Sequence, residues 1–300
     1  MSEEYQIVPA EARHFRHQVI GDAVLFNADC LSVLPTLGNV DAVVTSPPYG
    51  QQRDYGKKIG NWRALVSTAM LRVPGHETTQ ILVNLGIIHR DGEVVPYWQG
   101  LIDDMRSAGW RHFGWYVWDQ GPGLPGDWAG RLAPSHEFIF HFNKKPRKIN
   151  KIVPCTHAGK SRGTKSGLRS SDGSISAWSA EDLTTQEFRI GDSVIRTVRH
   201  KHVGGIEAGH PAVYPVPLPR ELIASFTVDV DTILDPFMGS GTTGVACAKL
   251  GRKFIGIEID PGYFDIACRR IDDAYRQRDL FRDEPKPPKP VQQSLLGDAA

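Results

Sequence analysis

The chain has 300 residues, of which 23% are charged, and a formal net charge of +1. This length suits one large α/β domain with an insertion, or two domains, and the small net charge means that a polyanion would be held by a local basic patch. The four cysteines form no Cys-x-x-Cys pair, which argues against a zinc site and a disulfide framework. The amino terminus lacks a signal-peptide core and no apolar run reaches the ~18 residues of a membrane span, so we expect a cytoplasmic protein without a membrane partner.

Short apolar runs bounded by turn residues predict buried strands in the first half of the chain. The predicted strands lie at 23–26, 40–44, 81–85, 113–118 and 138–142, and helical patterns lie at about 61–73 and about 95–108. Because strands alternate with helices, the sequence predicts an α/β fold with a doubly wound, mostly parallel sheet.

A second series of elements begins near residue 210. Its first helix has one apolar face, formed by Leu218, Leu222, Ile223 and Phe226. The elements predicted after it are a strand at 231–235, a helix near 242–250, a strand at 253–258 and a helix from Pro261 to about Tyr275. The remaining tail is rich in proline, and we expect it to be flexible.

Between the two series, residues 144–169 contain nine Lys or Arg residues and no acidic residue. A solvated basic loop and a nucleic-acid contact surface both fit this pattern. In the second interpretation, the segment at 196–202 is a further part of the surface, and the phosphate-binding residues are Lys144, Lys145, Arg147, Lys148, Lys160, Arg162, Lys165 and Arg169.

The stretch ILDPFMGSGTTG at 233–244 places a glycine-rich turn between a strand and a helix. Glycines let a ligand approach the backbone, and the amides at a helix start favour negative charge. A P-loop is disfavoured because no lysine follows the glycines. Three interpretations stay open on this segment alone: a nicotinamide dinucleotide site, a structural turn without ligand, and an S-adenosylmethionine site. In the last, Asp235 would face the ammonium group and Glu258 the ribose.

The stretch TSPPY at 45–49 contains two prolines, which fix φ and have no amide hydrogen. If the substrate is the exocyclic amine of a nucleobase, the Ser46 hydroxyl and the Pro47 carbonyl would accept hydrogen bonds from its N–H groups. Pro48 would keep that carbonyl rigid. Tyr49 would stack on a base swung out of the duplex. A purely structural turn is the alternative for this motif taken alone.

Together, TSPPY and DPFMGSGTT (235–243) resemble the catalytic and cofactor motifs of the amino-methylating DNA methyltransferases, which transfer a methyl group from S-adenosylmethionine to cytosine or adenine. The catalytic motif comes first, which resembles the permuted order of the beta class. The resemblance spans roughly residues 22 to 275. It implies the catalytic residues Ser46, Pro47, Pro48 and Tyr49, and the cofactor-binding residues Asp29, His210, Asp235, Pro236, Phe237, Gly239, Ser240, Gly241, Thr242, Thr243 and Glu258.

The same resemblance implies a Rossmann-like methyltransferase fold with permuted connectivity. The predicted parts are a catalytic half at 1–143, a target-recognition region at 144–209, a cofactor-binding half at 210–281 and a tail at 282–300. No metal is required, because methyl transfer from a sulfonium is a displacement with a good leaving group. The expected partner is double-stranded DNA.

Serine before the two prolines is more frequent in cytosine-N4 enzymes and aspartate in adenine-N6 enzymes, so we expect cytosine N4 and keep adenine N6 as the alternative. Cytosine-C5 methylation is disfavoured because the one Pro-Cys pair, at Cys155, lies in the wrong segment. A catalytically silent DNA-binding protein and a nucleotide-dependent oxidoreductase are lower alternatives.

Two further partners follow from resemblance. A cognate restriction enzyme is one of them. The other is the replicative sliding clamp, because QQSLL at 292–296 resembles the short peptide by which bacterial proteins dock on it.

Overall fold

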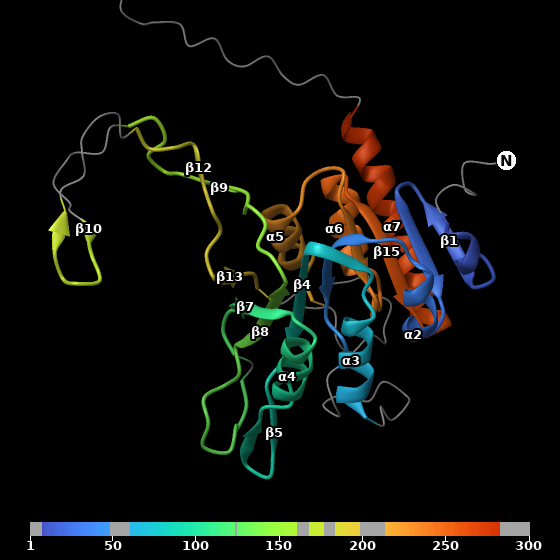
Figure 1. Cartoon of the computed structure of the whole chain (residues 1–300), viewed down its shortest axis with the longest axis horizontal. Helices are drawn as coiled ribbons and strands as arrows, with labels where there is room; N and C mark the ends of the chain where they lie inside the picture. Colours follow the sequence, from blue (N-terminus) through green and yellow to red (C-terminus); the bar gives the residue numbers. More distant parts are fainter. Residues whose placement is uncertain are drawn as a thin grey trace, which may run out of the picture.

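The computed structural model of the chain is shown in Figure 1. It describes residues 8–48, 61–123, 125–160, 168–176, 184–198 and 214–282. Among these residues, no helix combines the length and the apolar character that crossing a membrane requires.

A nine-stranded sheet with the order β1-β2-β15-β14-β3-β4-β8-β7-β13 forms the centre of the fold. Its strands are β1 (Arg16–Ile20), β2 (Ala23–Asn27), β3 (Val40–Thr45), β4 (Gly75–Leu85), β7 (Arg111–Asp119), β8 (His136–Asn143), β13 (Val194–Arg196), β14 (Thr232–Asp235) and β15 (Lys253–Glu258). Five neighbours, β2, β15, β14, β3 and β4, are mutually parallel, whereas β8 is antiparallel to both of its neighbours. The carboxyl ends of the five parallel strands therefore meet at one edge, here called the carboxyl edge.

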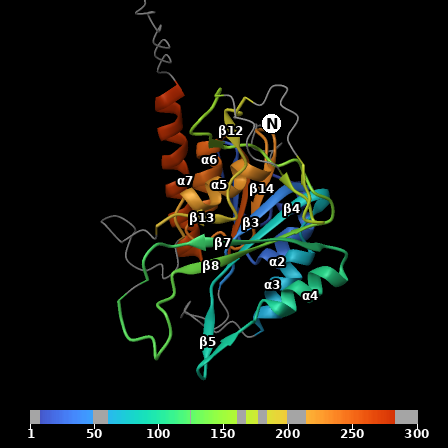
Figure 2. The same ribbon diagram turned by 90° about the vertical axis from the view of Figure 1, so that its left-hand side faces the viewer.

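Two helical layers cover the sheet (Figures 1 and 2). One layer contains α2 (Cys30–Val33), α3 (Trp62–Leu71) and α4 (Gln99–Ser107), and the other contains α5 (Pro217–Phe226), α6 (Thr242–Leu250) and α7 (Pro261–Arg282). Short 3-10 turns lie at η1 (Ala10–Ala12) and η2 (Leu34–Thr36). Each layer closes its own apolar core: the successive residues Ile233 and Leu234 are both fully buried, in opposite cores. This follows from the alternation of side chains along a strand.

The strand order reverses between β3 and β14. From β3 the chain passes through α3 to β4, on one side, and from β14 it passes through α6 to β15, on the other. In open α/β sheets, ligands bind outside the carboxyl ends of the strands at such a reversal. The stretches TSPPY and DPFMGSGTT begin at the carboxyl ends of β3 and β14, so the fold brings both to this point.

Smaller elements surround the sheet. The hairpin of β5 (Ile88–Arg90) and β6 (Glu93–Val95) turns at Asp91 and Gly92, whose positive φ angles of 51° and 84° suit a type I′ turn. Two short pairs, β9 (Val153–Pro154) with β12 (Phe188–Arg189) and β10 (Leu168–Arg169) with β11 (Ile175–Ser176), lie at the left of Figure 1, apart from the helical layers.

These two pairs belong to the part of the chain between β8 and β13, here called the outlying segment. Asn150 joins the start of the outlying segment to the end of α5. Its backbone amide donates to the Ser225 carbonyl at 2.8 Å, and its side-chain amide donates to the carbonyls of Ala224 and Thr227 at 2.9 and 2.8 Å. Carbonyls at a helix end lack partners within the helix, so Asn150 satisfies them.

The predicted doubly wound, mostly parallel α/β fold is confirmed. The strand predicted at 81–85 is longer than expected, because β4 begins at Gly75 and its first residues, GHETTQ, are polar and carry no apolar pattern. The edge strands β1 and β13 and the hairpin β5–β6 were not predicted, since they have few apolar residues or are very short.

Candidate active site

The proline turn follows β3 without a break. Pro47 is buried, and Ser46 and Pro48 are half-buried. The indole N–H of Trp62, the first residue of α3, donates to the Pro48 carbonyl at 2.6 Å. This bond fixes the turn against the helix that follows it. Tyr49, the fourth predicted catalytic residue, lies outside the described residues.

The glycine turn between β14 and α6 uses glycine for conformation and for close packing. Gly239 and Gly241 have φ angles of 54° and 82°, in the left-handed region that glycine adopts without strain. A Cβ atom on Gly244 would lie 2.4 Å from Cδ1 of Ile271 on α7. The glycines therefore set the path of the turn and let α6 and α7 approach each other.

Arg270 on α7 holds this turn from behind. Its guanidinium Nη1 donates to the carbonyl and the hydroxyl of Ser240 at 2.5 and 2.7 Å, and it lies 3.4 Å from the Thr242 hydroxyl. Burial lowers the pKa of Arg270. A largely buried cation thus lies at the start of α6, where the helix dipole already favours negative charge.

Asp235, the last residue of β14, is 1% exposed. Its carboxylate accepts hydrogen bonds from the hydroxyls of Thr45 and Thr243, both at 2.7 Å, and from the backbone amide of Phe237 at 3.1 Å. Burial raises the pKa of Asp235 to about 6, and the three hydrogen bonds act in the opposite direction. The three donors to Asp235 are neutral groups, and among the residues that the structure describes Asp235 forms no ion pair.

Glu258 ends β15 on the next strand. Its two carboxylate oxygens accept hydrogen bonds from the backbone amides of Gly239 and Asp260, both at 2.8 Å. Burial raises the pKa of Glu258. A direct hydrogen bond therefore joins the glycine turn, at Gly239, to the carboxylate of Glu258.

Asp29 lies beside Glu258, because β2 and β15 are neighbours. The amide of Ala28 and the side chain of Asn27 both donate to the Glu258 carbonyl, at 3.1 and 2.9 Å. Asp29 caps the short helix α2 by accepting a hydrogen bond from the Leu31 amide at 2.9 Å, and it is exposed. Three predicted cofactor-binding acids, Asp29, Asp235 and Glu258, thus lie at the carboxyl edge. His210 lies outside the described residues.

Three predicted phosphate-binding residues lie at the opposite edge of the sheet. Because β8 is antiparallel to β4, its end carries Lys144, Lys145 and Arg147 to the amino ends of the parallel strands. Lys145 forms an ion pair with Glu77 on β4 at 3.5 Å. The residue of β4 that pairs with Thr45 is Val83. Glu77 lies six residues before Val83, which is ~20 Å along the strand from the proline turn.

All three of these cations already have partners. The Lys144 ammonium lies 5.2 Å from the centre of the Trp110 ring, and Arg147 forms an ion pair with Asp231 at 2.8 Å. Lys144, Lys145 and Arg147 are therefore held against the sheet and do not lie next to the proline turn.

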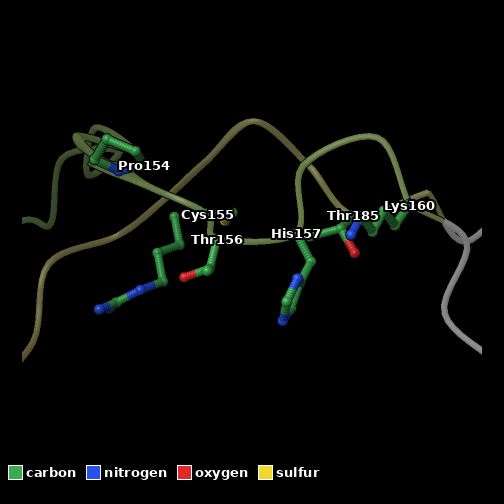
Figure 3. A pocket seen from close by; sticks show the side chains of 7 residues that line it. Pro154, Cys155, Thr156, His157, Lys160 and Thr185 are labelled. Atoms are coloured by element: carbon green, nitrogen blue, oxygen red, sulfur yellow. The ribbon is translucent and has the colours of Figure 1, made fainter.

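A cavity of about 470 Å³ lies in the outlying segment, beside the β9–β12 pair. Figure 3 shows Thr156 and His157 pointing to the same side of the chain there. The cavity is lined by Pro154, Cys155, Thr156, His157, Lys160, Thr185 and Arg189. Of the predicted phosphate-binding residues, Lys160 lies at this cavity and Lys148 is exposed. Arg169 is in β10, and Arg162 and Lys165 lie outside the described residues.

Three residues of this arrangement were not predicted from the sequence. Thr45 and Arg270 are two of them, and the third is Tyr214, whose hydroxyl is hydrogen-bonded to Thr243. A polar residue ending an apolar strand, as Thr45 does, is the signal that was available. Arg270 breaks an otherwise apolar helical face that includes Ala267 and Ile271.

Known proteins with similar sequences are DNA methyltransferases. A family model described as DNA methylase (N6_N4_Mtase) matches residues 40–269. The Type II methyltransferase M.Cfr9I of Citrobacter freundii is 30% identical over 296 residues, which cover 84% of this chain and 88% of that protein. The orphan methyltransferase M.BamHII of Bacillus amyloliquefaciens is 28% identical over 240 residues, or 77% of this chain and 88% of that protein.

Solved structures share the fold at lower identity. The PvuII DNA methyltransferase (cytosine-N4-specific) superposes with a TM-score of 0.61 at 20% identity, over 87% of this chain and 93% of that chain. The M1.HpyAVI–SAM complex superposes with a TM-score of 0.53 at 19% identity, over 82% and 98%. Because the family model covers more than half of the chain, and because M.Cfr9I is 30% identical over most of it, this protein belongs to the N6/N4 DNA methylase family.

Proposed function

We propose that this DNA methyltransferase transfers a methyl group from S-adenosylmethionine to the exocyclic N4 amine of cytosine in a flipped-out base within a specific DNA sequence. The hydrogen bond between Thr45 and Asp235 carries the proposal, because it joins the end of the catalytic strand to the start of the glycine turn. Cytosine is supported by Ser46 in the catalytic turn and by the likeness to a cytosine-N4-specific structure.

The carboxyl edge fits S-adenosylmethionine, which supplies an electrophilic methyl group on a sulfonium when bound. Asp235 and Glu258 are acids whose pKa values are raised by burial, and within the described part of the chain Asp235 has neutral hydrogen-bond donors and no ion pair. A positively charged nucleoside would restore the balance. Asp29, Asp235, Glu258, the turn at 236–243 and His210 are the residues proposed to hold it.

In the proposed reaction, the Ser46 hydroxyl and the Pro47 carbonyl accept hydrogen bonds from the amine of the target base. These bonds draw on the N–H groups, so that the nitrogen lone pair leaves its conjugation with the ring and can attack the methyl carbon. The carbon–sulfur bond would break as the nitrogen–carbon bond forms, and the amine would release one proton to solvent. Pro48 and its bond to Trp62 keep the two acceptors rigid, so little reorganisation is needed during the reaction. Tyr49 stacks on the flipped base.

Replacing Ser46 with alanine should lower methyl transfer ~10²-fold, because one preorganised acceptor is lost. Incubation with unmethylated DNA and labelled cofactor measures the rate, and digestion to nucleosides with mass spectrometry identifies the product as N4-methylcytosine. Ser107→Ala is the matched control, because that hydroxyl bonds its own helix at the Asp103 carbonyl. Unchanged turnover by Ser46→Ala would contradict the role of the serine.

The same digestion tests the alternatives. Detection of N6-methyladenine would show that the target base is adenine and not cytosine, and the proposed mechanism would stay the same. No methylated nucleoside, from protein that binds the cofactor, would favour a silent DNA-binding protein. Mapping the modified positions also gives the target sequence, and a restriction enzyme that cuts this sequence is the partner that we propose.

Asp235→Asn should weaken cofactor binding about tenfold or more while leaving the ligand-free protein intact at pH 8. The substitution removes a buried charge, and the hydrogen bonds can be remade because Thr243 has the Val44 carbonyl as another acceptor, at 3.3 Å. Titration calorimetry measures the affinity. Equal affinity in both proteins would remove Asp235 from the proposed cofactor site.

The pH dependence of the ligand-free protein gives a second measurement on this variant. Burial raises the pKa of Asp235 from 3.8 to about 6. The contribution of Asp235 to the free energy of unfolding is therefore complete below pH 3.8 and is lost as the pH rises through about 6. The stability of Asp235→Asn should not show this decrease with pH. Asp104→Asn is a control of opposite sign, since the pKa of Asp104 is lowered to about 2 by its hydrogen bond to Arg63.

We propose that the region at 144–209 contacts the target DNA through the cavity beside the β9–β12 pair. Lys160, His157 and Arg189 line this cavity and supply donors for phosphate oxygens. Lys148, Arg162, Lys165 and Arg169 belong to the same proposed surface.

Lys160→Ala should weaken DNA binding and reduce the slope of log affinity against log salt by about one, the signature of one lost phosphate contact. Lys145→Ala should have a smaller effect, because Lys145 pairs with Glu77 at the opposite edge of the sheet. Fluorescence anisotropy at several salt concentrations measures both. An equal slope change for the two lysines would contradict this placement.

We further propose that QQSLL at 292–296 docks on the replicative sliding clamp. The segment lies outside the described residues, and its support is the sequence resemblance. Removing residues 284–300 should abolish binding to purified clamp in surface plasmon resonance while methyl transfer stays unchanged. Clamp binding by the shortened protein would disprove the proposal.

A further inference from the structure

A chain of hydrogen bonds runs through the buried centre of the site. The Tyr214 hydroxyl is bonded to the Thr243 hydroxyl, which is bonded to Asp235 at 2.7 Å, and Asp235 is bonded to the Thr45 hydroxyl at 2.7 Å. Thr243, Asp235 and Thr45 are at most 2% exposed. The chain therefore connects three parts of the fold that are far apart in the sequence: the segment before α5, the β14–α6 turn and the end of β3.

The direction of each bond follows from the chemistry of the groups. Ionised Asp235 can only accept, so Thr45 and Thr243 both donate their hydrogens to it. The Thr243 hydrogen is then used, and its oxygen must accept from Tyr214. Tyr214 keeps its hydrogen to donate, because burial raises its pKa. Every hydroxyl in the chain thus points its hydrogen towards the carboxylate.

The far end of this chain is next to the catalytic turn. Thr45 is the last residue of β3, and Ser46 follows it directly. Thr45 cannot shift along the strand without breaking its bond to Asp235. Hydrogen bonds that act in series polarise one another, so Tyr214 strengthens the bond from Thr243 to Asp235. That bond fixes the carboxylate that accepts the Thr45 hydrogen.

We propose that Tyr214 is a positioning residue for methyl transfer, whose hydroxyl holds the end of β3 in place through Thr243 and Asp235. The chain thereby couples the segment before α5 to the position of Ser46. This inference rests on the proposed role of Ser46. Tyr214 itself touches neither the amine nor the proline turn in this role.

Tyr214→Phe should lower the rate of methyl transfer about tenfold at saturating DNA and cofactor, the effect of one lost hydrogen bond, and should change the cofactor Kd less than about twofold. Total labelled methyl on DNA is counted, so the result does not depend on which base is modified. Tyr116→Phe is the matched control: its hydroxyl is also part-buried and bonded, to Nδ1 of His141 at 2.9 Å, in the same core.

A double-mutant cycle with Thr45→Val tests the coupling itself. Valine keeps the shape of threonine and suits a strand, so the fold is retained. If the residues act as one chain, Tyr214→Phe should add little to the defect of Thr45→Val. Rates that fall by the product of the two single effects would overturn the proposal.

Thermal stability of the ligand-free protein against pH is a measurement independent of activity. The loss of stability assigned to Asp235 by comparison with Asp235→Asn should move to higher pH in Tyr214→Phe and stay in place in Tyr116→Phe. The physical reason is that Thr243 becomes a weaker donor without Tyr214, so the charged form of Asp235 is less favoured. An unmoved transition in Tyr214→Phe would overturn the proposal.

Among the described residues, other ionisable groups lie around this chain of hydrogen bonds. Burial raises the pKa values of Cys247 on α6 and Tyr214, which stay neutral, and Arg270 on α7, whose charge acts on Tyr214, stays charged. Glu258 on β15 also titrates on the acid side, but it is present in all variants and cancels in the comparison with Asp235→Asn.

Ser46→Ala, measured beside these variants, separates the two proposals. An inactive Ser46→Ala with a fully active Tyr214→Phe would refute the positioning role and leave the proposed function standing. A fully active Ser46→Ala would refute the proposed function, and the cycle and the stability measurement would still decide whether the chain of hydrogen bonds acts as a unit.

Discussion

The hydrogen bond between the Thr45 hydroxyl and the Asp235 carboxylate is the contact on which the site depends. It spans 190 residues of sequence and 2.7 Å of space. The two residues end adjacent parallel strands at the point where the strand order reverses, so no other pair of strands could bring the proline turn and the glycine turn so close. The permuted order of the two motifs along the chain leaves this contact unaffected, because it depends only on which strands are neighbours.

The same contact requires a buried charge, which is costly without a partner. Asp235 has three neutral hydrogen-bond donors and, among the described residues, no ion pair, and burial raises the pKa values of Asp235 and of the neighbouring acid Glu258. A positively charged ligand, as proposed above, would offset this cost of burial. A group arranged in advance for its ligand gives up little energy in reorganisation when the ligand binds.

Much of this could be predicted from the sequence, because local patterns carry it. Apolar runs identified the central strands, and two short motifs indicated the family and the two turns that the fold brings together, the proline turn and the glycine turn. The pairings could not be predicted, since Thr45 finds its partner through strand order and not through its neighbours in the sequence. The basic residues show the same limit: only the antiparallel direction of β8 reveals that Lys145 and Arg147 lie at the edge opposite Ser46.

The outlying segment is fastened to the sheet at both of its ends. It leaves β8 at the amino edge, where Arg147 and Asn150 hold it to Asp231 and to the end of α5, and it returns through β13, which pairs with the last residues of β7. A loop whose ends are fixed by the scaffold can change its length at a small entropic cost. A change of length between these two attachments would therefore leave the sheet and the two turns in place, which suits the proposed role of residues 144–209 in contacting DNA.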